Sequence, residues 1–228
     1  MSRRFLRQAI EWGYRARKLV ASPELKAINA YSIAGLSRLE NLHALAQDVV
    51  ERNVPGDFVE CGVYNGGSAA AVSSAIRGTN RRSWLFDSFA GMPPTSEADG
   101  PDAESFVDKC VGSEEQVHAA MRLARCPVDS YVIRKGWFQE TFPVGPLPKG
   151  VAYLHIDADW YESVLLALDT FYGLVPDGGV IVLDDFGHWE GCREAFYDFA
   201  GQRKIKPLLE RFGHTQAYWV KNRLHNRG

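Results

Sequence analysis

The sequence predicts an α/β fold in which a mostly parallel sheet is covered by helices on both faces. Three observations predict it. After Pro55-Gly56, short β-rich runs alternate with helical stretches; several of these runs are apolar throughout; and two β-type segments close the chain with no helix between them. Alternating strands and helices indicate a parallel sheet, and the last two segments indicate an antiparallel hairpin at its edge.

The first 54 residues predict two helices that precede the sheet. Apolar residues recur at alternating steps of four and three from Phe5 to Leu19, which is typical of an amphipathic helix, and the other face is basic. A second apolar face runs along residues 36–52. We expect residues 1–54 to form a helical extension or lid, packed on its own domain or on a second subunit of a homodimer. Attachment to a membrane surface is the alternative for the basic helix.

The remaining chain, residues 55–228, predicts one α/β domain. Runs rich in β-branched and aromatic residues indicate strands, and stretches with apolar residues on one face indicate helices. The predicted strands cover residues 57–61, 83–86, 131–133, 151–156 and 179–183, and the predicted helices cover residues 68–76, 114–123, 162–174 and 190–200. We expect residues 206–210 and 216–221 to form the closing hairpin. Residues 90–106, rich in Pro, Gly, Asp and Ser, predict a mobile active-site flap.

Composition argues against several classes of protein. The 26 Lys and Arg residues against 28 Asp and Glu residues leave no electrostatic reason to expect a nucleic-acid partner. The four cysteines form no C-x-x-C pair, which argues against a zinc ribbon or a disulfide framework and favours reduced thiols in a cytoplasmic protein. No run approaches the roughly 18 apolar residues of a membrane span, so we expect no integral membrane segment.

A glycine-rich turn joins the first predicted strand to the next helix, in the sequence FVECGVYNGGS from Phe58. Ligands of open parallel sheets bind at the carboxyl ends of strands, where a helix N-terminus presents N–H groups to an anion. Gly62 lets the backbone approach a ligand, Ser68 can offer a hydroxyl to a carboxylate, and Glu60 can face an ammonium group. These partners suit the methionine end of S-adenosylmethionine, although an ordinary tight turn is the alternative. The spacing departs from G-x-G-x-x-G, which disfavours a nicotinamide oxidoreductase.

Two further strand ends complete the predicted cofactor site. Asp87 ends the second strand, with Ser88 beside it, where nucleoside-binding α/β proteins grip ribose hydroxyls. Gly136 and Trp137 follow the third strand, where a cofactor adenine would lie, and the indole could stack on it. Hydrophobic packing is the alternative for this tryptophan.

Paired aspartates follow two buried apolar strands. Asp157 and Asp159 follow the fourth strand, and Asp184 and Asp185 follow the fifth. Adjacent strand ends would bring Asp157, Asp184 and Asp185 together, and carboxylates that close repel unless a cation lies among them. Oxygen ligands without a cysteine or histidine cluster suit Mg²⁺. The alternative is that these residues cap the helices that follow, which explains one acid at each strand end more easily than two.

The catalytic base has three candidates. Two residues beyond Asp157, Asp159 would point to the same side of the sheet if the strand persists, so it could take a proton from a hydroxyl that a metal has acidified. His155 and His188 flank the same blocks and are rival bases, since imidazole titrates near neutral pH. A core histidine within its strand is the alternative for His155, whereas we expect His188 to face the site.

At this point the sequence resembles the macrocin O-methyltransferase (TylF-like) family of metal-dependent sugar O-methyltransferases. The resemblance covers about residues 31–221. The blocks that carry it are YSIAGLSRLENL from Tyr31, PGDFVECGV from Pro55, DSFAGMP from Asp87, KGWF from Lys135, HIDADWYES from His155, DDFG from Asp184, and Tyr218-Trp219.

The resemblance implies a class I methyltransferase with a Rossmann-like sheet, together with S-adenosylmethionine and Mg²⁺. In this family Asp157, Asp184 and Asp185 would hold the metal and Asp159 would be the general base. The implied acceptor is a small-molecule glycoside whose hydroxyl is methylated. A catechol-type O-methyltransferase is the enzyme alternative, and a non-catalytic S-adenosylmethionine-binding scaffold protein is the alternative from another class. A scaffold, however, has no need of a cluster of like charges.

Overall fold

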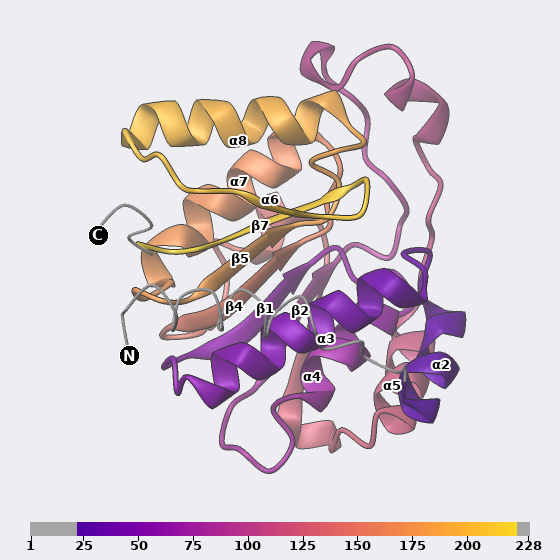
Figure 1. The fold of residues 1–228 in the computed structure, drawn as a ribbon. Coiled ribbons are helices and arrows are strands. Elements are labelled where there is room, and N and C mark those ends of the chain that lie inside the picture. The colour runs from indigo at the N-terminus through magenta and orange to yellow at the C-terminus, as the bar shows by residue number, and fades with distance from the viewer. Residues whose placement is uncertain (1–21, 223–228) are drawn as a thin grey trace.

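A seven-stranded sheet lies between two layers of helices (Figure 1). The computed structural model describes residues 22–222, so the amphipathic helix predicted from Phe5 to Leu19 lies outside the described residues. The strands are arranged in the order β3-β2-β1-β4-β5-β7-β6. Their bounds are β1 Asp57–Cys61, β2 Ser83–Asp87, β3 Tyr131–Lys135, β4 Val151–Ile156, β5 Val180–Leu183, β6 Glu210–Phe212 and β7 Gln216–Val220.

The first five strands are parallel, and β7 pairs antiparallel with both β5 and β6. This is the class I methyltransferase fold, with the predicted hairpin at one edge. The predicted strands agree with β1 to β5 to within two residues at each end. The first hairpin strand was predicted wrongly at residues 206–210, because β6 begins only at Glu210. Pro207 has no N–H to donate to a neighbouring strand, which disfavours a paired strand over residues 206–209.

The helices form two layers, each with its own hydrophobic core cluster (Figure 1). One layer covers the face of the sheet that carries Phe58 and Tyr153, and it contains α2 Pro23–Ile28, α3 Leu36–Glu51, α4 Gly67–Ser74 and α5 Glu114–Leu123. The other layer contains α6 Phe138–Thr141, α7 Tyr161–Phe171 and α8 Glu190–Arg203. Because α2 and α3 share a core cluster with α4 and α5, they are packed as an integral layer. Their separate role as a lid stays a prediction.

The backbone ladder continues past the strand ends and aligns three loops at the carboxyl edge of the sheet. The amide of Gly62 donates to Phe86, that of Asp157 to Cys61, and that of Asp184 to Ile156, at 2.8 to 2.9 Å. The loops that carry the glycine turn and both aspartate pairs are therefore held side by side. The sequence pattern predicted this convergence, and it determines where the site forms.

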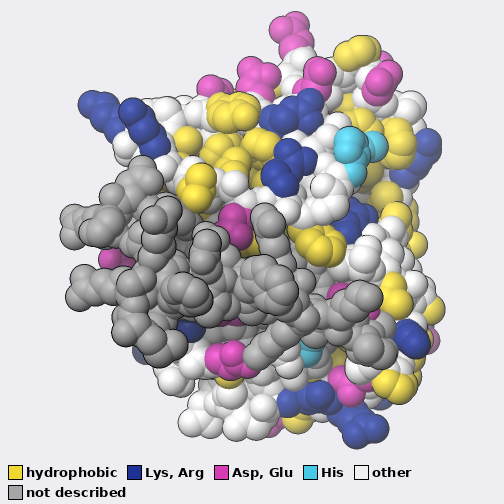
Figure 2. Space-filling view, in the orientation of Figure 1, with side chains coloured by type: hydrophobic (Ala, Val, Ile, Leu, Met, Phe, Trp, Pro, Cys, Tyr) yellow, Lys and Arg dark blue, Asp and Glu magenta, His cyan; other side chains and the backbone are white. Residues whose placement is uncertain are grey.

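The surface carries charges of both signs. On the face shown in Figure 2, hydrophobic side chains gather around α8, with basic and acidic side chains between and beside them. Among exposed apolar side chains, Tyr197 on α8 and Leu208 before β6 are 60% and 53% exposed. Within residues 22–222, no helix has the length and apolar character needed to cross a membrane. The predicted homodimer stays a prediction.

Candidate active site

One cavity opens at the carboxyl edge of the sheet and gathers most of the predicted site residues. Those that line it are Gly62, Ser68, Asp87, Ser88, Gly136, Trp137, Asp157, Asp159, Asp184 and Asp185. Tyr31, Ser32, Ile33, Ala34 and Arg38, from the segment before α3 and its first turn, form another part of the wall. Ile33 is 66% exposed, so this segment presents an apolar side chain beside the cavity. The N-terminal residues thus contribute to the site directly.

The glycine turn is held by the carboxylate of Asp87. One oxygen accepts from the amides of Val63 and Tyr64, at 2.7 and 2.8 Å, and the other accepts from Phe89 at 2.7 Å. A carboxylate oxygen can accept more than one hydrogen bond, so Asp87 can fix the loop and still face a ligand in the cavity. The predicted ribose contact stays a prediction, and the position of Asp87 is compatible with it.

Glu60 lies behind the cavity wall, because only 2% of it is exposed and it is absent from the lining. The hydroxyl of Ser68 donates to Oε1 of Glu60, and Nδ1 of His155 lies 3.3 Å from the same oxygen. Oε2 is buried and has no hydrogen-bond partner among the described residues. The geometry therefore offers no direct contact between Glu60 and a cofactor ammonium group, and Ser68 is the member of this pair that reaches the cavity.

The aspartates form a compact acidic cluster. Carboxylate oxygens of Asp157, Asp159 and Asp185 lie within 4.8 Å of one another, and Asp157 also forms such a group with Asp184 and His155. Burial, together with the neighbouring carboxylates, holds the pKa of Asp157 and of Asp185 well above the ordinary value. Oδ2 of Asp185 is buried without a hydrogen-bond partner in the described chain. A hard divalent cation such as Mg²⁺ would relieve both the repulsion and the orphaned oxygen, so the residues fit this ion.

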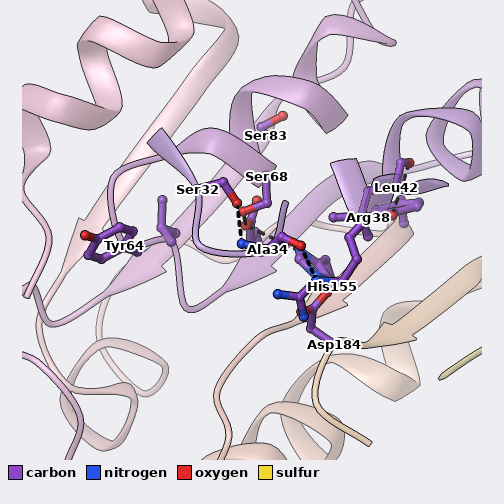
Figure 3. Close-up of polar contacts among 12 residues, drawn as sticks. Ser32, Ala34, Arg38, Leu42, Tyr64, Ser68, Ser83, His155 and Asp184 are labelled. Carbon is purple, nitrogen blue, oxygen red and sulfur yellow. Dashed lines mark hydrogen bonds and ion pairs between the residues drawn. The ribbon is translucent and has the colours of Figure 1, made fainter. Parts of the chain in front are cut away.

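Asp184 differs from the other three aspartates, because three side-chain donors contact its carboxylate. Arg38 donates to Oδ2 at 2.6 Å, and His155 donates to Oδ1 at 3.3 Å (Figure 3). Gln216 also donates to Oδ1, at 2.5 Å. Asn41 in turn donates to the amide oxygen of Gln216 at 3.0 Å. Burial alone would raise the pKa of Asp184, but the hydrogen bond and charge of His155 and the charge of Arg38 lower it. Asp184 is therefore a carboxylate anchored to α3, β4 and β7.

Neither histidine is placed as a base. His155 is fully buried and absent from the cavity lining, so it cannot touch a substrate. Burial lowers its pKa, but the hydrogen bond to Asp184 and the close contact with the charged Glu60 outweigh burial and raise that pKa to about 10. His188, which we expected to face the site, is exposed, lies against Trp189 with ring centroids 4.4 Å apart, and does not line the cavity. The predicted catalytic role of His188 has no support from the geometry.

Asp159 is the carboxylate best placed for proton transfer. It lines the cavity, and it adopts a left-handed backbone with φ of 56°, a conformation that costs energy in a residue other than glycine. Burial raises its pKa to about 6, although the hydrogen bonds that it accepts from Trp189 and Asp185 lower it. A base of that pKa is mostly ionised at neutral pH and can still accept a proton. The prediction of Asp159 as base stays a prediction that this geometry supports.

Sequence reasoning missed Arg38 and Gln216. They contact Asp184 across separations of 146 and 32 residues, so no local spacing connects them with the aspartates. One signal was present. Arg38 lies in the block from Tyr31 that carries the family resemblance, and a charged side chain on the apolar side of a helix needs a partner.

The predicted flap is tied down at both its base and its tip. Met92 and Asp108 pair through a backbone hydrogen bond of 3.0 Å, which closes the loop. At the tip, the buried carboxylate of Asp99 accepts from the amide of Tyr161 at 2.7 Å and from the amide of Ser96 at 2.7 Å. Tyr161 is the first residue of α7, two positions after Asp159. The flap is thus joined to the element that follows the acidic cluster, and its mobility stays a prediction.

Replacing Asp99 with alanine is expected to lower the free energy of unfolding by about 1–3 kcal/mol, because the part-buried amides of Tyr161 and Ser96 lose their acceptor. Chemical denaturation, compared with Asp102→Ala at an exposed flap position, measures this. Equal unfolding free energies for the two variants would show that Asp99 does not anchor the flap.

Comparisons with known proteins find similar sequences and structures. Residues 11–221 match the family described as Macrocin-O-methyltransferase (TylF). Over 198 residues the chain is 32% identical to 8-demethyl-8-(2,3-dimethoxy-alpha-L-rhamnosyl)-tetracenomycin-C 4'-O-methyltransferase of Streptomyces olivaceus, which covers 83% of this chain and 75% of the relative.

Two solved structures extend the likeness. The O-methyltransferase NovP is 31% identical, with a TM-score of 0.74 over 86% of this chain and 84% of that one. The O-methyltransferase from Bacillus cereus in complex with SAH is 15% identical, with a TM-score of 0.58 over 93% of this chain and 97% of that one, which shows a shared fold alone.

Proposed function

Because the chain belongs to the macrocin O-methyltransferase (TylF) family, we propose that it is a methyltransferase that uses S-adenosylmethionine and Mg²⁺ to methylate a sugar hydroxyl of a glycosylated natural product or glycan. One observation carries the proposal. A single cavity joins the glycine turn after β1 to the acidic cluster after β4 and β5. A methyl donor and an acceptor hydroxyl would meet where these two parts adjoin.

The cofactor part of the cavity suits S-adenosylmethionine. Ser68 in the first turn of α4 and the backbone at Gly62 would hold the methionine end, and Asp87 with Ser88 would hold the ribose. Gly136 and Trp137 line the cavity beyond β3, where the indole would stack on the adenine. Glu60 would act from behind the wall by orienting Ser68, with which it shares a hydrogen bond.

The acidic part of the cavity suits the acceptor. Asp157, Asp184 and Asp185 would hold Mg²⁺, with Asp157 close to each of the other two, and the anchored Asp184 would keep the cluster in place. When bound, S-adenosylmethionine supplies the methyl group and the metal lowers the pKa of the acceptor hydroxyl. Asp159 would accept the hydroxyl proton at a carboxylate oxygen, which leaves the acceptor oxygen free to attack the methyl group.

We expect purified protein to bind S-adenosylhomocysteine and to transfer methyl groups to glycosides only when Mg²⁺ is present. Replacement of Asp185 by asparagine should lower transfer by roughly 10²-fold or more, because it removes one negative charge from the cluster that would hold the cation. Calorimetric titration followed by a transfer assay on a panel of glycosides and catechols measures both.

The matched control is Asp169→Asn, because Asp169 is exposed on α7 and lies outside the cavity. This variant should transfer like the unchanged protein. Failure to bind S-adenosylhomocysteine under any condition would refute the proposal. Methyl transfer to catechols but not to glycosides would support metal-dependent O-methyl transfer and would show that the acceptor is a catechol rather than a sugar.

A further inference from the structure

A continuous row of buried side chains runs behind the cavity, from its cofactor part to its acidic part (Figure 3). Ser68 contacts Glu60, Glu60 lies 3.3 Å from Nδ1 of His155, and Nε2 of His155 lies 3.3 Å from Oδ1 of Asp184. Arg38 closes the row on the far side of Asp184. Glu60, His155 and Asp184 are 2%, 0% and 1% exposed, so these three side chains are shielded from bulk solvent.

Strand register places the three central members on one face of the sheet. Glu60 on β1 pairs with His155 on β4, and His155 pairs with Val182 on β5. Side chains alternate between faces along a strand, so Asp184, two residues after Val182, points to the same side as His155. The order of the strands, β1-β4-β5, therefore makes His155 the central member of the row.

His155 cannot act on a substrate, because it does not line the cavity. Its two ring nitrogens instead face two buried carboxylates from opposite parts of the site. The pairing is unequal, since Nε2 makes a hydrogen bond to Asp184 while Nδ1 has the distance of an ion pair to Glu60 without a hydrogen bond. The imidazole ring can therefore still gain a hydrogen bond to Glu60.

We propose that His155 is a positioning residue that couples cation binding at the acidic cluster to cofactor binding at Ser68; this inference rests on the proposed function. A cation among the aspartates draws the carboxylate of Asp184 toward itself and weakens its hold on the imidazole. The ring then moves onto Glu60 and completes a hydrogen bond there. Glu60 holds Ser68, which lines the cofactor part of the cavity, so the cation strengthens cofactor binding.

Titration of S-adenosylhomocysteine into the full chain, with and without Mg²⁺, tests this coupling without any turnover. The product lacks the sulfonium charge, which removes direct repulsion between cofactor and cation. We expect Mg²⁺ to tighten binding by about fivefold or more in the unchanged protein. In His155→Asn, whose side chain is too short to reach both carboxylates, the two dissociation constants should agree within about twofold.

Two further variants make the test specific. Glu60→Gln breaks the row at its other side and should also lose the coupling, and it decides the matter if His155→Asn fails to fold. Tyr153→Phe removes a buried hydroxyl from the same strand and face, one that donates to Leu42 at 3.3 Å outside the row, and should keep the full coupling.

The binding data for these variants support or overturn the coupling through His155. Loss of coupling in His155→Asn and Glu60→Gln but not in Tyr153→Phe supports the inference. Persistent coupling in a folded His155→Asn, or no coupling in the unchanged protein, overturns it and leaves the proposed function standing. Absence of any binding of S-adenosylhomocysteine to the unchanged protein overturns both.

Discussion

Replacing Asp159 with asparagine is expected to lower kcat by roughly 10²- to 10⁴-fold, the usual range for loss of a general base. The carboxylate lines the cavity beside the acidic cluster, and asparagine keeps its size while losing the ability to take a proton. Affinity for S-adenosylhomocysteine should change little, because the predicted cofactor contacts lie at other strand ends. Steady-state kinetics and calorimetric titration of the same preparation separate the two effects.

The pH dependence of kcat offers a second test of Asp159 as the base. Burial raises the pKa of Asp159 to about 6 before a cation binds, and a cation beside it lowers that value because it favours the ionised form. The base is active when ionised, so kcat should fall as the pH drops through this pKa. The acid limb should vanish from the residual activity of Asp159→Asn.

A matched substitution and a rival hypothesis complete the experiment. Asp102→Asn, at an exposed flap position outside the cavity, should leave kcat unchanged. If Asp159→Asn retained most of its kcat while His188→Gln lost it, the sequence-based alternative of a histidine base would be correct. The segment between β5 and α8, which carries His188, would then have to move its exposed imidazole into the cavity.

The fold was predictable from the sequence because its strands are short and strongly patterned. β1 and β4 matched the prediction at both ends, since each is a mainly apolar run bounded by glycine or aspartate. The short helix α2 was missed because its six residues show no full apolar repeat, although Ser22 caps it and Pro23 begins it. β6 was misplaced because its three residues are held by pairing with β7 rather than by their own propensity.

The candidate site was predictable only where a strand end carries a local signal. Two acids directly after a buried strand are unusual, and this pattern correctly located the cluster around Asp157 and Asp185. The donors that hold Asp184 come from α3 and β7, which only the folded chain brings close. Glu60 and His155 are likewise buried behind the residues that line the cavity. Residue type alone does not reveal whether a side chain lines a cavity or lies behind its lining.

Replacing Gly62 with alanine is expected to abolish measurable binding of S-adenosylhomocysteine and to lower the free energy of unfolding by roughly 3 kcal/mol or more, the combined cost of overpacking and a strained backbone. A Cβ at this position would lie 1.7 Å from the carbonyl oxygen of Asp157, with φ at +88°. The contact is between two backbones, so no side chain can rotate away to relieve it. The loop after β1 and the loop after β4 would have to separate.

This separation would damage both parts of the site, because the same contact places the glycine turn against the residue that is central to the acidic cluster. Gly201→Ala in α8 is the matched control, since a Cβ there meets no atom within 4 Å. Alanine in a helix interior should leave stability equal or raise it by about 0.5–1 kcal/mol. If Gly62→Ala had the same free energy of unfolding and the same affinity for S-adenosylhomocysteine as Gly201→Ala, the two loops would be free to move apart. The close backbone approach would then not be what joins the cofactor part of the cavity to the acidic part.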